Sequence, residues 1–142
     1  MSMHIPHYDN RNAAIVGRDD ADVPLAYFNI VRLKRGESFI SDVPGYETCL
    51  VPAHGSIDVE VRGEGLPTSR FEAVGGRASI WEGQPAAVYV PVVCSATFVC
   101  RSESTETFVA GARFGHGVAL RGQSRAQDAP NLWLVVNNKN LG

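Results

Sequence analysis

The chain has 142 residues, of which 44% are hydrophobic and 20% are charged, and its formal net charge is −2. These values fit one soluble globular domain, and so small a charge gives no electrostatic reason to expect nucleic acid or an anionic membrane as a partner. No apolar run approaches the roughly 20 residues that span a bilayer. The polar N-terminus has no apolar segment that would direct secretion, so we expect a cytoplasmic protein.

The first 24 residues look like an extended arm, and strand signals begin after them. Residues 25–33 are aromatic and aliphatic, with no Gly or Pro, which favours a strand. The clearest alternation lies at 56–62, where apolar and charged side chains take turns. We expect further strands at 38–41, 46–51, 70–74, 78–81, 87–90, 95–101, 106–110 and 132–136, and a hairpin made by 95–101 and 106–110.

Nine or ten short strands, with no convincing helical period, predict an all-β domain over residues 25–142, either a sandwich or a jelly-roll barrel. After Gly111 the pattern weakens. The three cysteines fit no zinc or CxxC spacing, so we expect them to be free, half-buried thiols in strands. They are Cys49, Cys94 and Cys100.

A family resemblance rests on the block GGRASIWEGQPAAVYVP at 75–91 and on the residues just before it, 71–74. Together with VRLKRGE at 31–37 and ETCLV at 47–51, this block resembles the 5-deoxy-glucuronate isomerases, bicupin enzymes of bacterial inositol catabolism. The resemblance is strongest over 25–110 and covers only the N-terminal cupin half of that family. It implies a single cupin, a β-barrel of the jelly-roll type, with little or no helix.

The resemblance also bears on metal binding. The family uses a divalent metal held in a C-terminal cupin, which this chain lacks. A typical cupin binds metal through G-x5-H-x-H-x3-4-E-x6-G and a second motif that supplies a third histidine. Here the two histidine positions of the first motif fall near Ser41 and Val43, and Ala96 stands at the third. Glu47 is the one ligand retained, so we expect neither a metal nor another cofactor in this barrel.

Glu47 is the polar group that we expect inside the barrel. Burial raises the pKa of a carboxyl, which suits a general acid or base, so Glu47 is a weak catalytic candidate. The alternative is a carboxylate that is hydrogen-bonded to a neighbouring strand or exposed at the rim.

Three other side chains are weak candidates for binding a sugar acid. The Arg77 guanidinium can hold a carboxylate, but it can equally pair with Glu72 or Glu82. Trp81 and Tyr89 can stack on a sugar ring or pack in the core.

Three hypotheses follow. The first is an isomerase-family protein reduced to its N-terminal cupin and inactive alone. The second is a non-catalytic module that binds a sugar acid or forms a homodimer through the edge strands at 25–33 and 132–136. The third is a metal-binding cupin with unconventional ligands, drawn from His4, His7, Glu47, His54 and His116.

Overall fold

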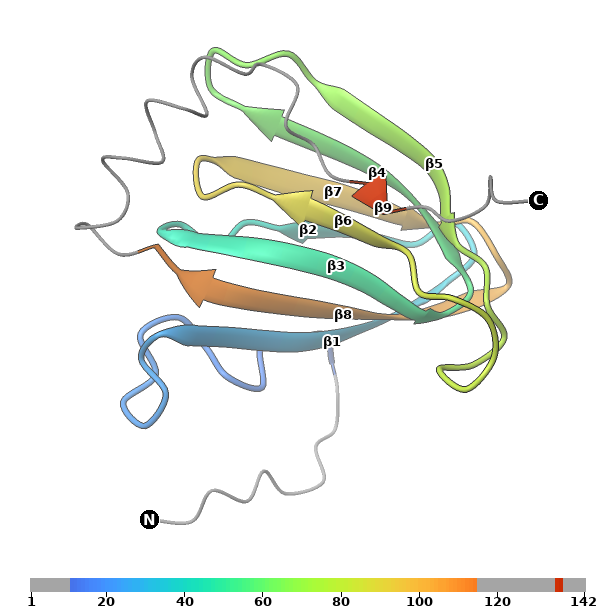
Figure 1. The fold of residues 1–142 in the computed structure, drawn as a ribbon, viewed down its shortest axis with the longest axis horizontal. Helices are drawn as coiled ribbons and strands as arrows, with labels where there is room; N and C mark the ends of the chain where they lie inside the picture. The colour runs from blue at the N-terminus through green and yellow to red at the C-terminus, as the bar shows by residue number, and fades with distance from the viewer. Residues whose placement is uncertain (1–10, 115–134, 137–142) are drawn as a thin grey trace.

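A computed structural model of the chain describes residues 11–114 and 135–136, which form nine strands and no helix. The strands make two antiparallel sheets that pack face to face (Figure 1). Sheet A has the order β1-β8-β3-β6-β9, and sheet B the order β2-β7-β4-β5. This is the predicted all-β architecture. The strands are β1 (Ala26–Lys34), β2 (Ser38–Ser41), β3 (Tyr46–His54), β4 (Ser56–Gly63), β5 (Ser69–Gly75), β6 (Ala87–Val90), β7 (Cys94–Cys100), β8 (Ser104–Arg113) and β9 (Val135–Val136).

The core lies between the two sheets and consists of the inward side chains of alternating strands. In β4 the apolar residues of the alternating pattern are buried and the charged ones face outward, as the sequence predicts. The cysteines are free thiols, two of them buried and one half-buried. The largest fully buried apolar side chains come from both sheets: Val31, Leu50, Ile57, Val61, Val74, Val88, Val90, Phe98 and Val109.

The strand predicted at 78–81 does not form. Gly75 and Gly76 have φ values of 93° and 105°, so the chain leaves β5 in a conformation that other residues rarely adopt. A turn follows, in which the Glu82 N–H donates to the Ser79 carbonyl over 3.2 Å. Trp81 is 88% exposed, so of its two expected roles, packing in the core is wrong.

The hairpin predicted from 95–101 and 106–110 is also wrong, although both strands exist. β7 pairs with β2 and β4 in sheet B, whereas β8 pairs with β1 and β3 in sheet A. The connection crosses between the sheets: the Arg101 N–H donates to Ser56, at the start of β4, and Glu103 accepts from Arg35, after β1.

The N-terminal arm is joined to sheet A. The side chain of Asn12 makes two hydrogen bonds with the backbone of Arg32. Val16 bridges to Phe28, whose carbonyl also accepts from Ile15. The arm therefore occupies the outer edge of β1, where we expected a second molecule to add its strand. No helix long and apolar enough to cross a membrane occurs within the described part of the chain.

Candidate functional site at the mouth of the barrel

We call one open end of the barrel the mouth. Side chains alternate between the two faces of sheet A, so every second residue along a strand points inward and lies one layer deeper from the mouth. Arg113, at the end of β8, and Tyr46, at the start of β3, are in register there. The next inward layer contains Gly111 opposite Thr48, and a Cβ at this glycine would lie 3.1 Å from Thr48 Cγ2. Asn29 follows one layer deeper.

The loop of the arm from Asp19 to Pro24 contacts residues at the mouth. The buried Tyr46 hydroxyl donates to the Pro24 carbonyl over 3.0 Å and accepts from the Asp19 N–H over 2.9 Å. The Asp19 carboxylate forms an ion pair with the Arg113 guanidinium. Three contacts with residues far away in sequence thus hold this loop at the mouth.

Two buried polar atoms below the mouth have no hydrogen-bond partner among residues 11–114 and 135–136: Asn29 Oδ1 and Ser41 Oγ. Asn29 is 1% exposed and Ser41 4% exposed. Both lie on the edge strands that meet where the two sheets join, and each is in register with a core residue, Val109 and Ala96 respectively. An unpartnered buried polar atom costs about 1–3 kcal/mol, so these two sites favour a group that can hydrogen-bond to them.

Asn29 is positioned by two other polar groups. Its side-chain N–H donates to the Asn12 carbonyl of the arm over 2.9 Å, which fixes the amide and leaves its oxygen available to accept. Its neighbour Tyr27 has a pKa raised by burial, an effect that a hydrogen bond with Asn29 partly offsets. No sequence pattern singles out Asn29, because one Asn inside an apolar strand has no distinctive spacing.

The positions at which a metal-binding cupin carries histidines face the barrel interior. Ser41, Val43 and Ala96 are all buried. None of these side chains is a good ligand for a divalent ion. Across residues 11–114 and 135–136, no three His, Cys, Asp or Glu side chains come together as a set that could hold a metal. The described residues therefore do not fit a cupin metal centre.

Glu47, predicted inside the barrel, lies on the opposite face of sheet A. In β3 the buried residues are Tyr46, Thr48 and Leu50, so Glu47 points outward. Its carboxylate accepts a 2.6 Å hydrogen bond from the Tyr89 hydroxyl. Burial raises the pKa of Tyr89, and the hydrogen bond to Glu47 and its negative charge raise it further. The placement inside the barrel was wrong, and the alternative, a carboxylate hydrogen-bonded to a neighbouring strand, is what the structure shows.

The other two predicted binding residues, Arg77 and Trp81, do not contact the pair formed by Glu47 and Tyr89. Arg77 donates to the Pro52 carbonyl at the end of β3, and Glu72 lies 4.0 Å from Arg101 instead. The loop that carries Arg77 also carries the exposed Trp81. Of the histidines considered as ligands, His54 ends β3 and is half-buried, while His4, His7 and His116 lie outside the described residues.

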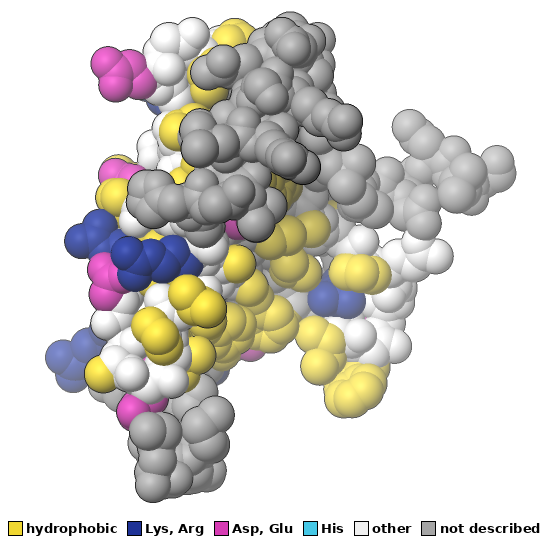
Figure 2. Space-filling view, turned by 60° about the vertical axis from the view of Figure 1, so that its left-hand side comes forward, with side chains coloured by type: hydrophobic (Ala, Val, Ile, Leu, Met, Phe, Trp, Pro, Cys, Tyr) yellow, Lys and Arg dark blue, Asp and Glu magenta, His cyan; other side chains and the backbone are white. Residues whose placement is uncertain are grey.

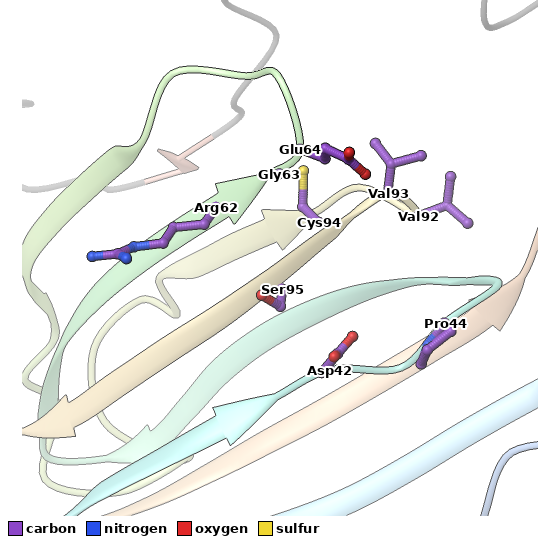
Figure 3. A pocket seen from close by; sticks show the side chains of 9 residues that line it. All are labelled: Asp42, Pro44, Arg62, Gly63, Glu64, Val92, Val93, Cys94 and Ser95. Atoms are coloured by element: carbon purple, nitrogen blue, oxygen red, sulfur yellow. The ribbon is translucent and has the colours of Figure 1, made fainter.

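A shallow pocket of about 360 Å³ lies at the rim, beside the ends of β2, β4 and β7 (Figure 3). Its lining mixes carboxylates, a cation and apolar groups, and Figure 3 shows Arg62 extending away from Cys94 and Val93. Arg62 pairs with Glu60 outside the pocket. The pocket is therefore a weaker candidate for a functional site than the inward side chains below the mouth.

Arg113 is the charged residue of the mouth that the sequence analysis missed. It follows Val109 and Gly111 at the spacing of a strand, and that periodicity would have placed it inward. Its partner Asp19 is 94 residues away in sequence, so no local pattern could have joined them.

Comparison with known proteins identifies the family. The sequence profile of the KduI/IolB family matches residues 4–131. The chain belongs to the KduI/IolB family. This confirms the resemblance to the 5-deoxy-glucuronate isomerases. A search among curated protein sequences gives no significant match.

Solved structures confirm the cupin fold of this KduI/IolB-family chain. An IolB-like protein from Salmonella typhimurium LT2 aligns with a TM-score of 0.60 and 22% identity, over 76% of this chain and 40% of that protein. A cupin protein from Bacteroides fragilis aligns with a TM-score of 0.51 and 16% identity, over 82% and 89%. A mutant of oxalate decarboxylase from Bacillus subtilis aligns with a TM-score of 0.52 and 16% identity, over 74% and 26%. The chain thus spans less than half the length of the IolB-like protein.

Proposed function

We propose that this chain is a ligand-binding cupin that holds a small hydroxylated acid below the mouth of its barrel, without a metal of its own. The observation that carries the proposal is the pair of unpartnered polar atoms, Asn29 Oδ1 and Ser41 Oγ, on the inner side of the barrel. Asn29 Oδ1 can only accept, so it selects a hydroxyl or another donor, while Ser41 can donate or accept.

Arg113 supplies the charge that an acid requires. A guanidinium binds a carboxylate through two parallel hydrogen bonds, and Asp19 already presents a carboxylate to Arg113 at the mouth. A sugar acid whose carboxylate replaces that of Asp19 would place its hydroxyls toward the interior. The loop from Asp19 to Pro24 must move aside for entry, and it is held by few hydrogen bonds.

Family membership points to the class of ligand. We infer a uronic acid because the sequence resembles the 5-deoxy-glucuronate isomerases, and the KduI/IolB match supports that resemblance. We place the protein in the cytoplasm and in inositol catabolism on the same ground.

A thermal-shift measurement on the full chain tests this function. Glucuronate and 5-deoxy-glucuronate are the probes, and glucose is the neutral control. A ligand that binds only the folded state stabilises it by about 2.7 kcal/mol at 100 times its Kd. We expect the acids to raise the melting temperature and glucose to have little effect. No shift with either acid at millimolar concentration would refute the proposal.

A second candidate function is the isomerisation of 5-deoxy-glucuronate in combination with a metal-bearing cupin half. The alignment that covers 40% of the IolB-like protein favours it, since a longer relative has room for a second domain. Because Ser41, Val43 and Ala96 stand at the histidine positions, we expect the chain alone to give no turnover. An assay with added zinc or manganese decides this, and robust turnover by the chain alone would refute our reading of these positions.

A further inference from the structure

The outer face of sheet A is apolar where the outer face of an antiparallel sheet is normally polar. Sheet B shows the usual pattern, since β4 presents Asp58, Glu60 and Arg62 outward. In sheet A the outward positions at the centre of β1, β3 and β8 carry only hydrophobic side chains. We call this group the outer patch; it consists of Phe28, Ile30, Cys49, Val51, Phe108 and Ala110.

The outer patch is continuous across three strands because its members are in register. Phe28, Ala110 and Cys49 form one cross-strand row, and Ile30, Phe108 and Val51 form the next. The rings of Phe28 and Phe108 lie 6.1 Å apart between the two rows. Tyr89 of β6 extends the first row. Figure 2 shows hydrophobic side chains gathered in a band across the middle of the molecule.

The two ends of the outer patch carry opposite charges. At one end β1 presents Arg32 and Lys34 outward beside Glu106 of β8, which pairs with Arg32 over 2.7 Å, so this end keeps a net positive charge. At the other end β3 presents Glu47. A two-fold axis through the centre of the patch would bring the basic end of one copy to the acidic end of the other.

We propose that the outer patch binds the same patch of a second copy of this chain, so that two A sheets pack face to face in a symmetric dimer. Such an isologous contact needs one self-complementary surface, and an apolar centre between ends of opposite charge provides it. The arm already covers the edge of β1, so this dimer uses the face of the sheet and not that edge.

The size of the patch predicts the strength of the dimer. Three strands at ~4.8 Å spacing and two outward rows at ~6.8 Å give a flat footprint of ~200 Å². Projecting and flanking side chains enlarge the accessible area, but the defined patch alone is smaller than the roughly 800 Å² per partner that specific interfaces bury. We therefore expect a weak, reversible dimer.

Sedimentation velocity on the full chain at low and high micromolar concentration tests the dimer. We expect a shift from monomer toward dimer as concentration rises, and a strict monomer throughout would overturn the proposal. Ala110→Arg places a charge at the exposed centre of the patch and should abolish the dimer. Ile40→Arg adds the same charge on the outer face of sheet B, where Ile40 is 66% exposed, and should leave the dimer intact.

Circular dichroism and the melting temperature of both variants show whether each is folded. A folded Ala110→Arg variant that still dimerises would overturn the placement on sheet A. Should Ala110→Arg fail to fold, Lys34→Glu offers a second route: it puts like charges at facing ends of the two copies and should weaken the dimer at least tenfold. An unchanged dissociation constant for Lys34→Glu would then refute the symmetric arrangement.

Discussion

The Tyr46 hydroxyl joins both ends of the loop from Asp19 to Pro24, because it accepts from the Asp19 N–H over 2.9 Å and donates to the Pro24 carbonyl over 3.0 Å. Tyr46 is 2% exposed, so its ring belongs to the core while its hydroxyl anchors the arm. The position of the loop from Asp19 to Pro24 therefore depends on the packing of the Tyr46 ring in the core.

Tyr46→Phe removes both hydrogen bonds and keeps the ring. We expect a loss of about 1–2 kcal/mol in the free energy of unfolding, since each net hydrogen bond contributes about 1 kcal/mol. Hydrogen exchange at the Asp19 amide should become faster, because that N–H loses its acceptor. Unchanged exchange at Asp19 would show that the hydroxyl does not hold the loop.

Gly55 and Gly65 form a matched pair for backbone strain, with φ values of 74° and 70°. A Cβ at Gly55 would lie 2.2 Å from the Ser104 carbonyl oxygen, whereas no atom of the described residues lies within 4 Å of one at Gly65. We expect Gly65→Ala to cost about 1–2 kcal/mol from the left-handed backbone alone. Gly55→Ala should cost at least about 3 kcal/mol, because overpacking adds to that strain. Equal losses in urea unfolding would contradict the close contact at Gly55.

The lowered pKa of the Asp58 carboxyl predicts that the stability of the fold depends on pH. Burial alone raises the pKa of this carboxyl, but the Ala73 N–H at 2.8 Å and Arg101 at 3.0 Å outweigh burial and lower it below the ordinary value of 3.8. The unfolded chain therefore binds the proton more readily, so the stabilisation is present above pH 3.8 and is lost as the pH falls through the lower, folded value.

Asp58→Asn should flatten this acid limb of the stability curve. Urea unfolding of both proteins between roughly pH 5 and pH 2 measures the slope, which depends on the difference in bound protons between the two states. We expect a small effect, since the Asp58 side chain is 43% exposed and solvent screens its ion pair. Identical slopes would show that Asp58 does not titrate differently in the folded protein.

The sequence predicted the strands far better than their arrangement. In β4 apolar and charged residues alternate, and this local pattern alone correctly predicted which side chains are buried. In β3 both faces carry apolar residues, such as Leu50 inward and Val51 outward, so the pattern could not say which side Glu47 takes. Likewise, β7 and β8 are consecutive strands with good alternation, and only long-range pairing assigns them to different sheets.

Most of the candidate site could not be predicted from sequence patterns, because it is formed by contacts between residues that are far apart in sequence. The histidine positions could be aligned, and the structure places Ser41, Val43 and Ala96 in the interior. The contacts of Arg113 with Asp19 and of Asn29 with Asn12 join segments that the sequence treats as unrelated.

Glucuronate binding by wild-type protein, Ser41→Ala and Thr105→Val, measured by calorimetry, tests the ligand site below the mouth most directly. Ser41 Oγ is unpartnered, so its removal should leave the ligand-free stability equal or higher and weaken binding about tenfold, the loss expected for one hydrogen bond. Thr105 is the control: its hydroxyl donates to the His54 carbonyl over 2.9 Å, so Thr105→Val should cost about 1 kcal/mol of stability and leave affinity unchanged. Equal affinity of Ser41→Ala and wild type, or no binding by either, would contradict the account.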